Sequence, residues 1–274
     1  MGLTGIILSA KIYLKKIKSQ YIDQITIKTK NLKETFEAFE KYSHMPYSVA
    51  WIDCLTKDDK IGKCLLTVGK FRDDGNLDYK KRKQLAVPFN FPNFILNSWT
   101  VRAFNMLYYG KAKNGVSKQT VDIETFFYPL DSVRCWNRIY GKNGFTQYQF
   151  ILPKDVSYEG LREILTVISN SRKGSFLAVL KLYGKANDNW LSFPIEGYSL
   201  ALDFKIDKDL FSLLDTLDEI VVKYKGRIYL TKDARVSKNT FEKGYPHIET
   251  FRKYRKDNKM HKKFQSYQSE RVGI

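Results

Sequence analysis

Several polar side chains stand in predicted β-strands at positions where an apolar residue is usual. Gln147 and Gln149 are two residues apart in the alternating run GFTQYQFILP, so both side chains leave the same face of one strand. Lys181 follows the apolar run FLAVL, and Lys232 comes just after RIYL, close to Tyr229. Together these groups would form a polar floor that can hold hydroxyl groups and an anion. The same pattern also fits the ordinary solvated face of an antiparallel sheet.

The sequence contains none of the common self-contained catalytic motifs. It has no P-loop, no G-x-G-x-x-G loop and no G-x-S-x-G elbow, which disfavours a kinase or hydrolase that works alone. The histidines lack partners at ligand spacing and no C-x-x-C pair occurs, so we expect no metal site, unpaired thiols and a reducing compartment. These residues are His44, His247 and His261, and Cys54, Cys64 and Cys135.

Basic residues outnumber acidic ones, 47 Lys and Arg against 29 Asp and Glu, and the net charge is +18. The cations are spread along nearly the whole chain instead of forming one stripe. A generic basic surface is therefore the favoured interpretation, followed by attraction to an anionic lipid or a phosphorylated substrate. Nucleic acid is the least favoured partner.

Apolar periodicity predicts alternating strands and helices in the second half of the chain. The expected strands are 144–153, 175–184, 197–206 and 227–233, and the expected helices are 157–174, with Ser157 as its cap and Gly174 as its end, and 206–226. The order β-α-β-β-α-β predicts an α+β fold, in which an antiparallel sheet with a ferredoxin-like core carries helices on one face.

The first half is less regular. Strand-like patterns cover 3–17, 21–29 and 47–54, and a helix is expected at 31–42, where Asn31 and Glu34 have capping-box spacing. Residues 71–98 are charged and then rich in Pro and Phe, which predicts a mobile loop with a functional role. The basic tail reads as a partly helical segment that wraps around another body, and no internal repeat is apparent.

The chain begins MGLTGIIL, which reads like the interior of a domain. No charge precedes this apolar run and its length falls short of a secretory signal. No later stretch approaches the roughly 18 apolar residues of a membrane span. We therefore expect a cytoplasmic protein.

Long and specific blocks of the sequence carry a resemblance to known enzymes. The blocks are FFYPLDSVRCWNRIYGKNGFTQYQFILP, SFLAVLKLYG, LSFPIEGYSLALDF, RIYLTKDAR and the closing RVGI. They resemble the flavin-dependent sugar oxidases related to decaprenylphosphoryl-ribose 2-oxidase, which are FAD enzymes of the vanillyl-alcohol-oxidase type. The similarity spreads over almost all 274 residues.

In that family a phrase like MGLTGII lies near the end of the FAD-binding domain, so the resemblance implies a C-terminal portion. It implies terminal strands of a truncated FAD-binding domain in 1–20, a substrate-binding domain in 21–234, and a basic segment, 235–274, that packs back on the flavin domain. FAD would then be bound mainly by a domain absent from this chain. The implied partners are a separate flavin-binding half or a reductase.

The resemblance also implies roles for the polar residues. Lys232 matches a catalytic lysine at the pyrimidine edge of the flavin, with Tyr229 beside it in the cofactor site. A cation there stabilises the negative charge that arrives with a hydride. Gln147, Gln149 and Lys181 match residues that line the substrate pocket.

Three further positions complete the implied pocket. Trp51 matches an aromatic residue that bounds it, while Ser199 and Ala201 stand where relatives carry a larger amide and a cysteine. These two departures leave the substrate open among polyprenyl-linked pentoses, nucleotide-linked pentoses and sugar lactones. Asn137 and Arg138 match a loop that supports the site.

The resulting hypothesis is the substrate-binding portion of an FAD-dependent oxidoreductase. Its substrate would be a polyprenyl-phospho-pentose whose 2-hydroxyl becomes a ketone. An aldonolactone oxidase of the same superfamily and a non-catalytic basic module without flavin are the alternatives. Residues 71–98 bring Phe89, Phe91 and Phe94 beside the basic run 80–83, which suggests an anionic membrane surface as a further partner, peripheral to the inner membrane.

Overall fold

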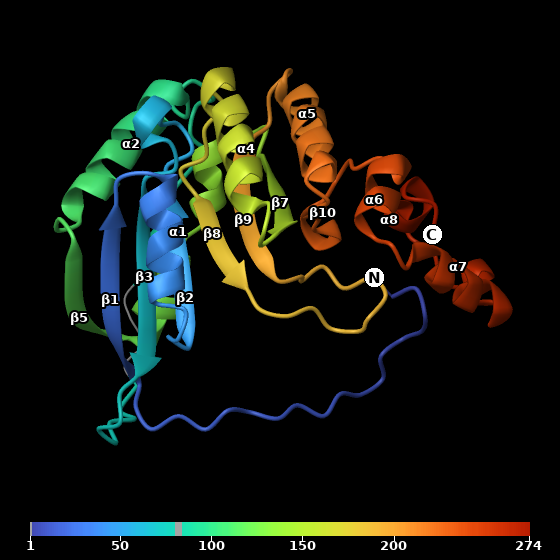
Figure 1. The fold of residues 1–274 in the computed structure, drawn as a ribbon, viewed down its shortest axis with the longest axis horizontal. Coiled ribbons are helices and arrows are strands. Elements are labelled where there is room, and N and C mark those ends of the chain that lie inside the picture. The colour runs from blue at the N-terminus through green and yellow to red at the C-terminus, as the bar shows by residue number, and fades with distance from the viewer. Residues whose placement is uncertain (1, 80–83) are drawn as a thin grey trace.

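The computed structural model describes residues 2–79 and 84–274, which build an eight-stranded sheet (Figure 1). The strand order is β10-β7-β9-β8-β2-β3-β1-β5, and all neighbouring strands are antiparallel. The strands are β1 (Tyr21–Thr29), β2 (Tyr47–Ile52), β3 (Cys64–Phe71), β5 (Val116–Asp122), β7 (Phe145–Pro153), β8 (Ala178–Tyr183), β9 (Gly197–Lys205) and β10 (Arg227–Ile228). The predicted mixture of helices with a mainly antiparallel sheet is confirmed.

Helices α1, α4 and α5 cover one face of this sheet, on the viewer's side in Figure 1. The helices are α1 (Leu32–Lys41), α2 (Ser98–Lys111), α3 (Ile123–Phe127), α4 (Ser157–Ser171), α5 (Leu210–Lys223), α6 (Lys238–Gly244), α7 (Ile248–Asp257) and α8 (Tyr267–Arg271). Alternate residues of β7, such as Phe150 and Leu152, join one core with the apolar stripe of α4, including Leu161 and Ile164, all of them fully buried. Each such side chain contributes about 1.5–3 kcal/mol on burial.

The sheet consists of two topologically equivalent halves. The first half runs β1-α1-β2-β3-α2-β5 and the second runs β7-α4-β8-β9-α5-β10, with equivalent strand orders β5-β1-β3-β2 and β10-β7-β9-β8. The halves meet where β2 pairs with β8, through the pairs Ala50 with Leu180 and Trp51 with Val179. The two halves share element order without visible sequence similarity, so the repeat is one of topology and not of sequence.

Two expectations for the first half need correction. Residues 3–17 form no strand, and most of their apolar side chains are exposed, with Leu8 at 93% and Leu14 at 90%, whereas Leu3 is buried. Alternation alone makes no strand without a neighbouring strand to bond to. Within 71–98, the short strand β4 (Leu85–Ala86) pairs in parallel with β6 (Val133–Arg134), so this segment is not simply a loop. The basic run 80–83 lies outside the described residues.

Element ends also differ from expectation in the second half. Val156 is the N-cap of α4, while the Ser157 hydroxyl donates to the Pro153 carbonyl at 2.7 Å, and the helix closes at Arg172 in the left-handed region instead of at Gly174. The last strand, expected over 227–233, has two residues and is followed by the 3-10 turn η4 (Leu230–Lys232). Lys232 therefore belongs to a turn at the sheet edge.

The basic tail packs against the β10 end of the sheet (Figure 1). The Tyr245 hydroxyl donates to the Ile228 carbonyl at 2.8 Å. Arg255 of α7 is 1% exposed, and its Nε donates to the Leu3 carbonyl at 3.1 Å. The tail thus completes the core beside β10 and binds the beginning of the described chain.

Helix α2 was not predicted, and it lies across the strand ends of the first half. Asn97 caps it by accepting hydrogen bonds from the backbone N–H groups of Trp99 and Thr100. The buried Asn105 amide donates to the Asp53 carboxylate at 2.7 Å. Neither α2, with 14 residues, nor any other helix in the described part of the chain is long and apolar enough to cross a membrane.

The three thiols are expected to differ sharply in reactivity. Burial raises the pKa of both Cys54 and Cys64 to about 12, so at pH 8 about one molecule in 10⁴ carries either thiolate. Cys135 is exposed. Iodoacetamide at pH 8 should alkylate Cys135 alone in the native protein and all three thiols in urea, as read by peptide mass spectrometry. Rapid native labelling of Cys54 would contradict the buried position.

Candidate functional site

The predicted substrate residues share the sheet face that lies opposite the helices. Strand register places Gln149 beside Ala201, Ala201 beside Val179, and Val179 beside Trp51 in one row across four strands. One pleat period away, Ser199 pairs with Lys181. Because side chains alternate along each strand, this row and its neighbours form one wall. The structure thus brings the predicted residues together, although they come from both halves of the sheet.

Lys232 points at this wall. Its Nζ donates to the Oε1 of Gln147 at 2.6 Å, and the Nε2 of Gln147 donates to the Asp203 carboxylate at 2.9 Å. The turn that carries Lys232 is fixed because the Tyr229 N–H donates to the Gln149 carbonyl at 2.8 Å. The result is a chain from ammonium to amide to carboxylate, in which Gln147 can offer its oxygen only to the cation while its nitrogen faces the anion.

Asp203 is the member of this chain that sequence reasoning missed. It is 6% exposed, and burial raises the pKa of its carboxyl, while the Gln147 hydrogen bond and the Lys232 charge act in the opposite direction. Its spacing was a usable signal, since Ser199, Ala201 and Asp203 are alternate residues of one strand and must share a face.

Gln149 and Ser199 form a second polar pair on the wall. The Gln149 Nε2 donates to the Ser199 hydroxyl at 3.1 Å, and both residues are buried. This contact fixes the orientation of the amide, whereas Ala201, half-buried between them and Asp203, contributes only volume. Lys181 is exposed and makes no hydrogen bond or ion pair among the described residues, so it is adjacent to the site without joining its network.

Aromatic side chains bound the wall on both sides. The Trp51 indole N–H donates to the Phe176 carbonyl at 3.0 Å, and its ring meets Tyr108 of α2 at a centroid distance of 5.0 Å. On the other side the Tyr229 ring packs on Phe193 at 4.4 Å. These contacts give both predicted aromatic residues fixed positions at the rim of the wall.

Tyr140 is a second residue that sequence reasoning missed. It is 1% exposed, and its ring stacks on Phe145 at 4.6 Å and on Phe176 at 5.6 Å. Burial, and then the nearby Asp203 charge, raises its pKa. Its hydroxyl is buried and has no hydrogen-bond partner among the described residues.

The supporting loop also has a definite contact. Arg138 donates to the carbonyls of Val87 and Pro88 at 2.9 and 2.7 Å. Arg138 therefore ties residues 87–88 to the loop that carries Tyr140, a structural role, and Asn137 makes no recorded side-chain hydrogen bond among the described residues.

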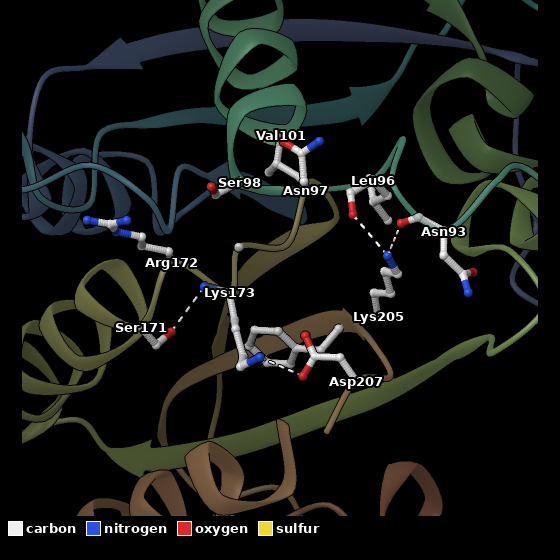
Figure 2. A pocket seen from close by; sticks show the side chains of 12 residues that line it. Asn93, Leu96, Asn97, Ser98, Val101, Ser171, Arg172, Lys173, Lys205 and Asp207 are labelled. Atoms are coloured by element: carbon white, nitrogen blue, oxygen red, sulfur yellow. Dashed lines mark hydrogen bonds and ion pairs between the residues drawn. The ribbon is translucent and has the colours of Figure 1, made fainter. Parts of the chain in front are cut away.

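The described residues offer no metal site, and a cavity lies elsewhere in the fold. In the described residues no group of three or more His, Cys, Asp and Glu side chains could hold a metal ion. A cavity of about 310 Å³ lies away from the wall, between the start of α2, the end of α4 and the end of β9 (Figure 2). Two of its cations are engaged, since Lys173 pairs with Asp207 at 2.5 Å and Lys205 donates to the Leu96 carbonyl at 3.2 Å, whereas the Arg172 guanidinium makes no such contact among the described residues.

Comparison with known proteins supplies the context. No family model matches the chain. Decaprenylphosphoryl-beta-D-ribose oxidase of Mycolicibacterium smegmatis is 34% identical over 267 residues, which cover 93% of this chain and 57% of that protein. An uncharacterized protein in the mprA 5′ region of Streptomyces coelicolor is 31% identical over 115 residues, 42% of this chain and 31% of that protein.

Two solved structures are distantly similar. FgChi7B has a TM-score of 0.47 at 12% identity and covers 89% of this chain and 54% of its own. CrmK, described as a flavoenzyme of caerulomycin biosynthesis, has a TM-score of 0.37 at 8% identity and covers 74% of this chain and 41% of its own. With TM-scores below 0.5, neither similarity supports an argument about fold or function.

The resemblance predicted from the sequence is confirmed: the chain is related to the sugar oxidases. The particular relative is decaprenylphosphoryl-beta-D-ribose oxidase, and the chain corresponds to its C-terminal part. The chain spans 57% of the length of that relative.

Gln147 is expected to be the structural centre of the wall. In Gln147→Leu the buried Asp203 carboxylate loses its donor, so the free energy of unfolding at pH 7 should fall by about 1–3 kcal/mol. Removing the Gln147 donor raises the pKa of Asp203 further, so the carboxyl of the variant is protonated more readily in acid. Because a protonated Asp203 no longer requires that donor, the loss of stability should become smaller as the pH falls. Urea titrations from pH 7 to pH 4 measure both effects.

Lys181→Met is the matched control, because Lys181 lies on the same face but is exposed. Its stability should change by less than about 0.5 kcal/mol. Equal stability losses in Gln147→Leu and Lys181→Met, or a loss that does not depend on pH, would contradict the network described above.

Proposed function

We propose that this chain is the substrate-binding portion of an FAD-dependent oxidoreductase that oxidises a sugar hydroxyl to a ketone. The observation that carries the proposal is the Lys232 ammonium held against the Gln147–Asp203 pair, in a chain related over 93% of its length to a sugar oxidase. The strand order β10-β7-β9-β8 supports the finer classification of the second half as ferredoxin-like.

Lys232 would serve as the catalytic cation. Oxidation of an alcohol to a ketone removes a hydride from carbon and a proton from oxygen. When bound, FAD supplies the hydride acceptor, its N5 atom. A fixed ammonium group close to the acceptor stabilises the negative charge that develops there, and Gln147 prevents the flexible side chain from turning away.

The residues of this chain fit one edge of a flavin but not a whole FAD molecule. Tyr229 offers a half-buried ring beside Lys232, which suits contact with a flat ring system. The sequence lacks a glycine-rich phosphate loop, so the diphosphate and adenine would be bound by other polypeptide. A flavin-binding half, or a reductase that exchanges electrons with it, is the partner this arrangement implies.

The wall would orient the sugar. Gln149 presents an amide whose direction is set by Ser199, and Lys181 adds an exposed ammonium that suits a phosphate group. Trp51 would bound the pocket with an apolar surface of the kind on which sugar rings pack. We therefore infer that the substrate is a polyprenyl-phospho-pentose oxidised at its 2-hydroxyl, in a cytoplasmic enzyme.

The proposal is tested with a chimera in which this chain replaces the C-terminal part of the Mycolicibacterium smegmatis oxidase. The chimera should be yellow, with flavin absorbance that copurifies with the protein. Lys232→Met should slow flavin reduction by substrate about 10²–10³-fold. Lys154→Met, in an exposed ion pair with Glu40, is the control and should reduce at the parent rate.

Two results would refute this assignment. A soluble chimera without flavin would favour a basic, non-catalytic module. Equal rates in Lys232→Met and Lys154→Met would show that the ammonium of Lys232 has no redox role.

The substrate class is tested separately with the same chimera. A polyprenyl-phospho-pentose should reduce the flavin, and Lys181→Met should raise KM about tenfold because it removes a charge near the phosphate. If an aldonolactone reduces the flavin faster and Lys181→Met leaves its KM unchanged, the chain is instead part of a lactone oxidase.

A further inference from the structure

Helix α2 packs against the protein so that most of its large apolar side chains face solvent. Its buried side is a narrow stripe through Val101 and Asn105, and Asn105 uses its amide to bind Asp53. The opposite side exposes large apolar residues, Trp99 at 77%, Leu107 at 70% and Met106 at 64%. Phe104 and Tyr108 flank the buried stripe and pack on Phe176 and Trp51. A surface helix normally shows the reverse arrangement, so this face suits an apolar environment outside the protein.

The turn before α2 extends the same apolar surface. Phe94 is 77% exposed, and its carbonyl accepts a hydrogen bond from the Asn97 side chain at 2.9 Å, which holds it next to the start of the helix. Phe94 and Trp99 therefore both lie near the N-terminal end of α2. Aromatic residues of this kind are enriched where a protein meets the interface of a bilayer.

Cations surround Trp99. A cavity of about 310 Å³ at the start of α2 is lined by Trp99 with Lys57, Arg102, Arg172 and Ser98. Arg102 and Arg172 make no hydrogen bond or ion pair within the described residues, and Figure 2 shows the Arg172 side chain pointing away from the Lys173–Asp207 pair. Two unpaired guanidinium groups beside an exposed indole favour a phosphate group as the ligand.

The surrounding sequence excludes negative charge. Between Asp78 and Asp122 the chain has no acidic residue, while Arg102, Lys111 and Lys113 follow one another along α2 and just beyond it. The occupant of the apolar face should therefore be negatively charged at its surface and apolar inside. An anionic bilayer has both properties, whereas single-stranded nucleic acid offers no site for Met106 and Leu107.

We propose that α2 is an interfacial helix that seats this protein on an anionic lipid bilayer. Trp99, Leu107 and Met106 insert among the acyl chains near the headgroups, and Arg102 and Arg172 bind a lipid phosphate in the cavity under Trp99. The proposal is independent of flavin, since none of these residues belongs to the polar wall.

Cosedimentation with vesicles tests the surface as a whole. The chain should bind vesicles of phosphatidylcholine and phosphatidylglycerol and bind pure phosphatidylcholine at least about tenfold more weakly. Trp99→Ser/Leu107→Ser should weaken binding to the mixed vesicles about tenfold or more. Leu8→Ser/Leu14→Ser removes equally exposed apolar side chains elsewhere and should leave binding unchanged.

The phosphate contact is tested with charge variants. Arg102→Gln/Arg172→Gln should weaken binding to anionic vesicles about tenfold and reduce its dependence on salt. The matched control is Lys243→Gln/Lys253→Gln, which removes two exposed charges from the distant α6 and α7 (Figure 1). Equal losses in the two double variants would indicate a diffuse charge effect and would overturn the site.

Brominated lipids identify the inserted residue directly. They should quench part of the tryptophan fluorescence of the bound protein, and the quenching should disappear in Trp99→Phe but persist in Trp190→Phe. Circular dichroism of each variant confirms that the fold is retained. Quenching that survives in Trp99→Phe, or tighter binding to single-stranded nucleic acid than to anionic vesicles, would refute the proposal.

Discussion

The alternation of side chains in an antiparallel sheet is the constraint on which this structure depends. Each strand gives one set of residues to the helices and the other set to the open face, and register then decides which residues of neighbouring strands meet. The polar wall exists because Gln147, Gln149 and Ser199 fall on the open face while Phe150 and Leu200 fall in the core. A shift of one residue in β7 would exchange the two sets and remove both the core and the wall.

The wall keeps a cation and an anion close without direct contact between them. Gln147 lies between Lys232 and Asp203 and binds both, so the ammonium is oriented by a neutral group while the carboxylate sits behind it, largely screened from water. A direct ion pair would place the carboxylate's charge against the ammonium, whereas the neutral amide oxygen takes up one of the three N–H groups and leaves the positive charge of Lys232 uncompensated at that contact. The remaining donors stay available to a ligand, which is the property expected of a binding surface and not of a purely structural ion pair.

Apolar periodicity was sufficient to predict the second half of the fold, because α4, α5 and strands β7 to β9 bury regular stripes. The failures have physical causes. Residues 3–17 alternate like a strand, yet the described chain offers them no neighbouring strand. Helix α2 was missed because its apolar residues face outward and its buried stripe includes Asn105, the reverse of the pattern used to find helices. Asp203 could have been predicted, because it is the next alternate residue of β9 after Ser199 and Ala201. Tyr140 could not, because it lies in a 3-10 turn that has no apolar periodicity.

The two halves of the sheet are joined by a narrow seam, since β2 and β8 share only the pairs Ala50 with Leu180 and Trp51 with Val179, whereas β7 and β9 pair along their whole length. Trp51 lies on the β2 side of this seam, and the glutamines and lysines of the wall lie on the β8 side. The seam does not divide the interior, because one hydrophobic cluster contains side chains from both halves of the sheet. A substitution at the seam would therefore alter the row that runs from Trp51 to Gln149 as well as the core behind it.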